Sequence, residues 1–130
     1  MLREGPIPHS IHGIIEYVAG ALFIAAPFLL SFDSGAATAA SILVGVVILF
    51  AAATTAGPTS LIDSVPIPAH VVLDYILAAA LIAAPFILAF SSETAPTALF
   101  IVMGVAHFLI TIGTRFEHGS ASRAAARAPK

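Results

Sequence analysis

The chain has 130 residues, of which 59% are hydrophobic and only 9% are charged, and its formal net charge is −2. Because a soluble domain carries about 25% charged residues, this composition excludes a water-soluble globular protein. The chain contains no cysteine, which excludes disulfides, thiolate metal sites and thiol catalysis.

Four apolar segments follow one another along the chain, each close to the roughly 20 residues that cross about 30 Å of hydrocarbon. We predict transmembrane helices at roughly 9–32, 37–56, 69–90 and 96–114. The stretches between them are rich in Gly, Pro, Ser and Asp, which interrupt helices. A membrane β-barrel would need alternating apolar and polar residues, which these segments lack. The fold class expected is therefore all-α: one integral membrane four-helix bundle within residues 1–115.

Polar residues interrupt the first segment near its start. His12 and Glu16 are four residues apart, so they share one face of a helix. Gly20 continues that face, and small residues on a membrane helix mark the approach of another helix, so we expect this face to point into the bundle. Tyr17 is expected at the inner membrane interface. Pro27 lacks a backbone donor, so the helix should kink or end there.

The third segment repeats the first without a gap. Residues 70–90 match residues 12–32 at 10 of 21 positions. The repeated polar residues and proline, with the same expected roles, are His70, Asp74, Tyr75 and Pro85. Duplication of a helical hairpin explains this pattern. Helices one and three then run in the same direction, so the two tandem repeats are parallel.

The second and fourth segments resemble each other more faintly, as LVGVVILF at 43–50 and VMGVAHFL at 102–109. The repeated unit is therefore a complete hairpin. We place repeat 1 at about residues 6–56 and repeat 2 at about residues 66–114.

Basic residues lie only outside the four segments, near the two ends of the chain. By the positive-inside rule, both the N- and C-termini are expected in the cytoplasm. Residues 116–130 are small, polar and basic, and we predict that they form a disordered cytoplasmic tail. The basic residues of the chain are Arg3, Arg115, Arg123, Arg127 and Lys130.

The strings IAAPFLLSF and IAAPFILAF resemble the signature of the SPW-repeat family of small bacterial integral membrane proteins. The motif positions are Ala26-Pro27-Phe28 and Ala84-Pro85-Phe86. Ser and Trp of the motif are replaced by Ala and Phe, while the proline, the aromatic character and the flanking pattern are kept. The resemblance implies paired membrane helices in a bacterial plasma (inner) membrane, and it implies no function.

A third histidine, His107, lies on the fourth segment and shares a face with Gly104 and Thr111. We expect it to join His12, Glu16, His70 and Asp74 in one polar layer on the cytoplasmic side. An unpaired charge near the bilayer centre costs about 2.5–3.5 kcal/mol on insertion scales. The groups of this layer should therefore be neutral, paired or hydrated.

Three roles for the layer remain open from the sequence. Hydrogen bonds among the side chains of the layer can be structural and fix the register of the helices. The histidines and carboxylates can handle protons or ions. They can also bind a haem or a divalent metal ion, although no cofactor is predicted outright. The expected function is a small non-catalytic structural or accessory subunit.

The sequence also limits the partners and the chemistry of this protein. No Gly-rich phosphate loop, zinc-protease helix or serine elbow occurs, so we expect no catalytic residues and no enzyme. No basic face suits nucleic acid. The expected partners are the lipid bilayer and either further copies of the chain, as a homo-oligomer, or a larger membrane protein complex.

Overall fold

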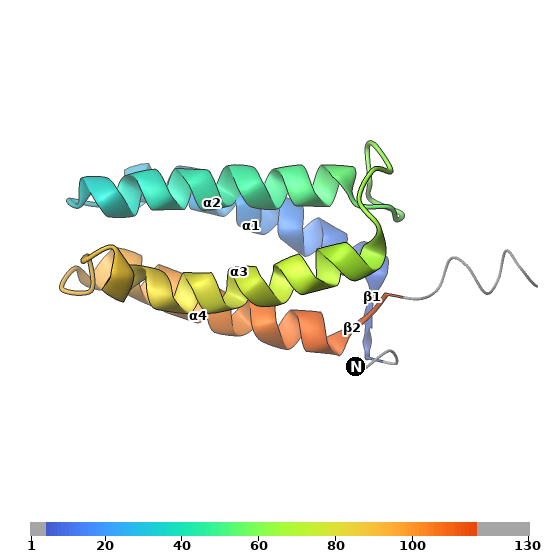
Figure 1. Ribbon diagram of the computed structural model, residues 1–130. Helices are drawn as coiled ribbons and strands as arrows, with labels where there is room; N and C mark the ends of the chain where they lie inside the picture. Colours follow the sequence, from blue (N-terminus) through green and yellow to red (C-terminus); the bar gives the residue numbers. More distant parts are fainter. Residues whose placement is uncertain (1–4, 117–130) are drawn as a thin grey trace, which may run out of the picture.

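The computed structural model describes residues 5–116. They form four long helices arranged as two hairpins, each made of two antiparallel helices (Figure 1). The first hairpin contains α1 (His9–Leu29) and α2 (Gly35–Thr54), and the second contains α3 (Ile67–Ile87) and α4 (Thr94–Gly113). All four helices are long and apolar enough to cross a membrane. The predicted all-α four-helix membrane bundle is confirmed.

The two hairpins run parallel to each other. Helices α1 and α3 both start at the end of the molecule that also holds the 55–66 connection and the last described residue, Phe116 (Figure 1). We call this the inner end. The short loops 30–34 and 88–93 lie together at the opposite, outer end. The repeats are therefore related by a rotation about an axis along the helices.

Two short parallel pairings close the inner end. Strands β1 (Ile7–Pro8) and β2 (Thr114–Arg115) pair in register Ile7 with Thr114. An isolated bridge pairs Thr55 with Val65, also in parallel. In the repeat alignment Ile7 corresponds to Val65, and they lie five residues before His12 and His70 respectively. The start of each hairpin is thus joined to the end of the other.

Glycines let the two helices of each hairpin touch. A Cβ added to Gly45 would lie 2.6 Å from the carbonyl oxygen of Gly20, so the backbones of α1 and α2 are in direct contact. A Cβ on Gly104 would lie 2.8 Å from the side chain of Ile82 and 3.1 Å from the carbonyl oxygen of Ala78. These glycines therefore serve packing inside each hairpin.

Large side chains fill the space between the hairpins in the outer half of the molecule. Phe23, Leu81, Phe90 and Phe100 belong to one buried cluster. The ring of Phe100 packs edge-on against Phe23, at 5.5 Å between centroids, and against Phe90, at 5.2 Å. This geometry is favoured between aromatic rings, so the outer half is held by apolar packing.

The helices α1 and α3 each end two residues after their internal proline, at Leu29 and Ile87. In both repeats a left-handed residue follows, Ser31 (φ 50°) and Ala89 (φ 58°). The next amide then bonds back to the proline carbonyl: Phe32 to Pro27 at 3.0 Å and Phe90 to Pro85 at 2.9 Å. This is the Schellman type of helix end. It stops each helix three residues before the predicted ends at 32 and 90.

Proline 27 leaves the carbonyl of Phe23 without its usual helical partner. The hydroxyl of Ser41 on α2 donates a hydrogen bond of 2.6 Å to this oxygen. Ser41 is fully buried. A side chain of the second helix thus satisfies the backbone of the first.

Phe116, the first residue of the predicted disordered tail at 116–130, is buried, with its ring 5.1 Å from the ring of His12. The remaining residues of that prediction, 117–130, lie outside the described residues.

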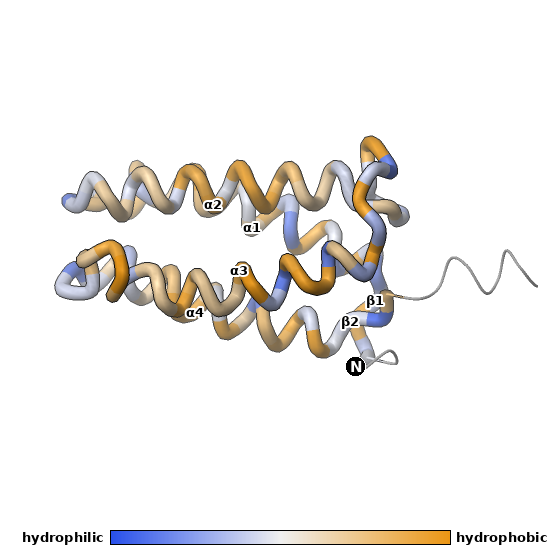
Figure 2. Tube along the Cα trace, viewed as in Figure 1, coloured by the Kyte–Doolittle hydropathy of each residue, from blue (hydrophilic) through white to orange (hydrophobic). Residues whose placement is uncertain are grey.

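Apolar residues predominate along all four helices (Figure 2). The outward faces of the helices carry large apolar side chains, among them Val18, Leu43, Phe50, Ile76 and Val102. Hydrophilic residues interrupt α1 and α3 toward the inner end (Figure 2). The chain thus presents hydrocarbon to the bilayer and keeps its polar side chains inside.

Candidate functional site

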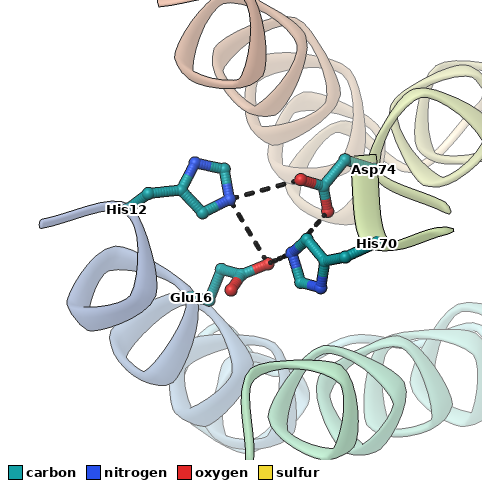
Figure 3. Close-up of side chains that lie close together, drawn as sticks. All are labelled: His12, Glu16, His70 and Asp74. Atoms are coloured by element: carbon teal, nitrogen blue, oxygen red, sulfur yellow. Dashed lines mark ion pairs between the residues drawn. The ribbon is translucent and has the colours of Figure 1, made fainter. Parts of the chain in front are cut away.

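Four titratable side chains from α1 and α3 meet between the hairpins (Figure 3). His12 and Glu16 lie one turn apart on α1, and His70 and Asp74 lie one turn apart on α3. Their residue exposures are 1%, 5%, 2% and 3% in that order. The polar layer expected from the sequence is thus a compact, buried cluster, here called the four-residue cluster.

The four-residue cluster forms a closed ring in which histidine and carboxylate alternate (Figure 3). Nε2 of His12 lies 3.5 Å from Glu16 Oε1 and 3.3 Å from Asp74 Oδ2. Nε2 of His70 lies 2.9 Å from Glu16 Oε1 and 3.3 Å from Asp74 Oδ1. Each carboxylate therefore faces one histidine of its own helix and one of the other hairpin.

The other nitrogen of each ring contacts a threonine at the inner end of a helix. Nδ1 of His12 lies 2.9 Å from Thr114 Oγ1, and Nδ1 of His70 lies 2.6 Å from Thr55 Oγ1. His12 belongs to the first hairpin and Thr114 to the second. In the other pair, His70 belongs to the second hairpin and Thr55 to the first. The two hydrogen bonds are reciprocal across the repeat axis.

The direction of these bonds follows from counting protons. The hydroxyl of Thr55 donates to the carbonyl of Ala51 at 2.7 Å, and that of Thr114 donates to Ile110 at 2.6 Å. A hydroxyl has a single proton to donate. Both threonine oxygens must therefore accept from histidine, so Nδ1 carries a proton in each ring. Nε2 of a neutral ring is then a lone pair that faces the carboxylates.

His107 on α4 reaches the same cluster from one side. Its Nε2 lies 3.2 Å from Oδ1 of Asp74, with good hydrogen-bond geometry. Its side chain is 11% exposed. The second carboxylate oxygen, Asp74 Oδ2, is buried and has no hydrogen-bond partner within residues 5–116. The layer thus contains a third histidine that contacts only one of the two acids.

Inner-end segments cover the cluster. The ring of Phe116 packs edge-on over His12, and His9 packs on Phe116 with 5.3 Å between centroids. The hydroxyl of Tyr17 donates a hydrogen bond of 2.9 Å to the carbonyl of Thr59 in the connection between the hairpins. Phe116 and the 55–66 connection therefore lie between the cluster and the surface of the inner end.

All five residues of the expected polar layer lie together. The two tyrosines lie apart from the ring itself: Tyr17 holds the 55–66 connection, while Tyr75 packs edge-on against Phe108 on α4, at 5.8 Å. Pro27 and Pro85 lie toward the other end of their helices, next to the outer loops.

Sequence reasoning missed Thr55, Thr114 and Phe116. The faint match between the second and fourth segments held a signal for the threonines, because its register aligns Thr55 with Thr114. Phe116 follows the last span, and the basic composition of the tail concealed it.

The geometry bears on two of the open roles. A haem ligated by His12 and His70 would need the space between the two Nε2 atoms for its porphyrin, and the oxygens of Glu16 and Asp74 lie there. On the outer side of the cluster, the buried neighbours on α1 and α3 are apolar, including Phe23 and Leu81. The arrangement therefore disfavours a haem and gives a proton relay no polar continuation along these two helices.

Comparisons with known proteins bear on the family. The family model of the SPW repeat domain matches residues 10–114, which include the four helices except the first residue of α1, and the five residues of the layer. Neither the curated proteins nor the solved structures compared with the chain contain a significant match. The chain belongs to the SPW repeat family, and it is an all-α, multi-pass membrane protein built from two parallel helical hairpins.

Proposed function

We propose that this protein is a small non-catalytic membrane subunit, structural or accessory, whose buried polar layer locks two hairpins into one bundle. The observation that carries this proposal is the reciprocal pair of bonds, His12 to Thr114 and His70 to Thr55. Each bond joins one hairpin to the other, and each sits beside a parallel backbone pairing at the inner end. The polar side chains thereby specify how the hairpins associate.

The burial of the layer supports a role without catalysis. A substrate would have to reach the four-residue cluster, whose members are at most 5% exposed and lie beneath Phe116 and the 55–66 connection. Side chains that bond one another across a closed seam hold a structure together. We therefore assign no residue of this chain a catalytic role.

The outer surface supports a packing role. Every helix also carries large apolar side chains that are exposed on the surface of the chain, among them Val18, Leu43, Ile76 and Val102. Such surfaces contact lipid, further copies of this chain or a larger membrane complex. The described spans carry few polar side chains outside the central layer. We therefore propose association in the membrane as the role of this protein.

The proposed location is the bacterial plasma membrane, with the inner end of the molecule toward the cytoplasm. Arg115 lies at the inner end, and the remaining basic residues fall in the two chain termini beyond the spans. The short outer loops, 30–34 and 88–93, contain acidic but no basic residues. This asymmetry is the one that orients membrane proteins.

The locking role is tested by removing the two threonine acceptors together, with Thr55→Val and Thr114→Val. Each change leaves a buried histidine N–H without its hydrogen-bond acceptor, which costs about 1–3 kcal/mol. The matched control is Thr54→Val, because Thr54 bonds its own helix in the same way, to Phe50 at 2.7 Å, and contacts no histidine. Unfolding of the purified protein in mild detergent should shift clearly in the double variant and barely in the control. Equal stability of the two would contradict the locking role.

The packing role is tested by the mass of the particle extracted in mild detergent. A homo-oligomer or a co-purified membrane partner is expected for the wild type and for the double threonine variant alike, because the associating surfaces face outward. A lone monomer in both would rule out the packing role.

A further inference from the structure

We propose that the four-residue cluster is a binding site for one divalent transition-metal ion, best suited to Zn²⁺, with His12, Glu16, His70 and Asp74 as its ligands. One donor atom from each residue can be chosen so that all four lie within 4.8 Å of one another. The cluster joins the two repeats, so the ion would fasten the hairpins together. This inference adds a site to the proposed structural role and does not depend on it.

Both histidines are oriented for ligation through Nε2. Both Nδ1 atoms donate to threonines, so in the neutral rings both Nε2 atoms present lone pairs to the centre of the cluster. Histidines that bind metals commonly fix their second nitrogen by such a hydrogen bond. Thr55 and Thr114 hold the two rings in the tautomer and direction that Nε2 ligation requires.

Three polar atoms of the cluster face one another without forming hydrogen bonds. Nε2 of His12, Nε2 of His70 and Oδ2 of Asp74 are buried, and their contacts within the cluster, at 2.9–3.5 Å, lack hydrogen-bond geometry. Buried polar groups in folded proteins are nearly always hydrogen-bonded. Among residues 5–116, three of the four buried side-chain atoms without a hydrogen bond belong to this cluster, the fourth being Nε of Arg115, and a cation at its centre would satisfy these three together.

Three distances between the proposed ligand atoms are close to those of a tetrahedral site. Oε1 of Glu16 lies 2.9 Å from Nε2 of His70 and 3.5 Å from Nε2 of His12, which lies 3.3 Å from Oδ2 of Asp74. Ligand atoms at about 2.0–2.1 Å from a tetrahedral zinc ion lie roughly 3.3 Å from one another, since a tetrahedron's edge is about 1.6 times its centre-to-corner length. The fourth contact of the ring, from His70 to Asp74, uses the other carboxylate oxygen, Oδ1.

The charges of the cluster also match a divalent ion. Two carboxylates and two neutral imidazoles carry two negative charges, which one divalent ion cancels. Without an ion, each Nε2 needs its own proton to face a carboxylate, and four separate charges are then buried in an apolar bundle. Mixed imidazole and carboxylate ligands suit Zn²⁺ and its first-row neighbours, whereas Ca²⁺ and Mg²⁺ prefer oxygen ligands only.

Asp74 also has the outer support that a ligand needs. Its Oδ1 accepts from His107, which leaves Oδ2 free to bind the ion. Four protein ligands in a buried, covered position are typical of structural zinc sites, whereas catalytic sites keep a position open. The geometry therefore points to an ion that stabilises the bundle.

The test uses the full chain, purified in mild detergent through an affinity tag without histidine. Metal is removed with a chelator, and Zn²⁺ or Co²⁺ is added back. We expect one zinc ion per chain by elemental analysis, visible cobalt bands of tetrahedral intensity, and a higher melting temperature with zinc than with chelator. These measurements need only the wild-type protein, so they remain decisive if a variant fails to fold.

Two variants locate the ion. His12→Gln with His70→Gln should weaken zinc binding by at least about 100-fold, the upper effect of losing an outer-shell partner. His9→Gln is the matched control, since His9 lies beside the cluster on Phe116 and is not a ligand. It should bind zinc as the wild type does.

The metal site is overturned if the wild type binds no zinc, if cobalt gives only the weak bands of octahedral coordination, or if the double variant binds as tightly as His9→Gln. The proposed structural role can survive that result. A bundle that binds no zinc but is still destabilised by the threonine changes keeps its hydrogen-bonded lock.

Discussion

The two hairpins make matching contacts in the polar cluster and different contacts along α2 and α4 toward the outer end. Each contributes a histidine, an acid and a threonine to the same closed arrangement, and each supplies the partners of the other. Toward the outer end, the contacts of α2 and α4 no longer match. Ser41 donates a hydrogen bond to the Phe23 carbonyl. The residue aligned with it in the second hairpin is Phe100, an aromatic residue of the core.

The N-terminal caps of α2 and α4 differ in the same way. Ser34 caps α2 by accepting from the amide of Ala37 at 3.1 Å. The aligned residue, Glu93, instead reaches across to the first hairpin and accepts from the amides of Asp33, at 2.7 Å, and Ser34, at 2.9 Å. Carboxylates are favoured at helix N-termini, so one acid supports the helix of the other repeat.

This difference has a physical cause. A reciprocal contact between repeats needs both copies of a residue, so a change in one copy removes half of the arrangement. A contact that needs one donor and one acceptor works from a single copy. Three residues make a contact of this second kind: Ser41, Glu93 and His107. In each case the aligned position of the other repeat holds a different residue.

The largest expected effect tests the one asymmetry within the inner layer. Asp74 faces three histidines and Glu16 faces two, because His107 contacts only Asp74. With chelator present, Asp74→Asn should lower the free energy of unfolding by about 3–5 kcal/mol, as expected for a broken buried ion pair, and Glu16→Gln should cost less. Denaturant unfolding in detergent measures both.

The control removes the asymmetry. His107→Ile places at this position the residue that the first hairpin has at the aligned position, Ile48. In that background the costs of the two acid variants should become similar. Equal costs already in the wild-type background would show that His107 adds nothing to Asp74.

An intermediate effect is expected from Ser41→Ala. The change leaves the buried Phe23 carbonyl unpaired, at a cost of about 1–3 kcal/mol. Pro27→Ala restores a backbone donor for that carbonyl, so Ser41→Ala should cost less when combined with it. A double-mutant cycle of unfolding free energies measures this coupling. Exposed Ser91→Ala is the control, and additive costs in the cycle would contradict the assignment.

The smallest effect is expected where the two hairpins agree again, at the left-handed residues after α1 and α3. A residue with a Cβ in this conformation costs about 1–2 kcal/mol, and glycine is the usual choice at this position. Ser31→Gly and Ala89→Gly should each stabilise the protein by roughly 1 kcal/mol, which thermal melts can resolve. A loss of stability from either change would show that its helix does not end in the left-handed turn.

Much of this fold follows from local pattern. The lengths of the apolar runs determined the four spans, and the internal repeat determined that the hairpins are parallel, because two copies of one hairpin cross the membrane in the same sense. The spacing of His12 and Glu16, copied in His70 and Asp74, placed each pair on one helix face. The cost of polar groups in lipid turned those faces inward.

The tertiary structure decided which atoms meet. Nothing in the spacing along one helix says that His12 bonds a threonine 102 residues away, or that His70 bonds Thr55 of the preceding hairpin. Those contacts depend on how the hairpins rotate and close at the inner end, which long-range packing sets. For the same reason the sequence predicted a polar layer, and only the assembled bundle showed two ring nitrogens and two carboxylates converging on one point.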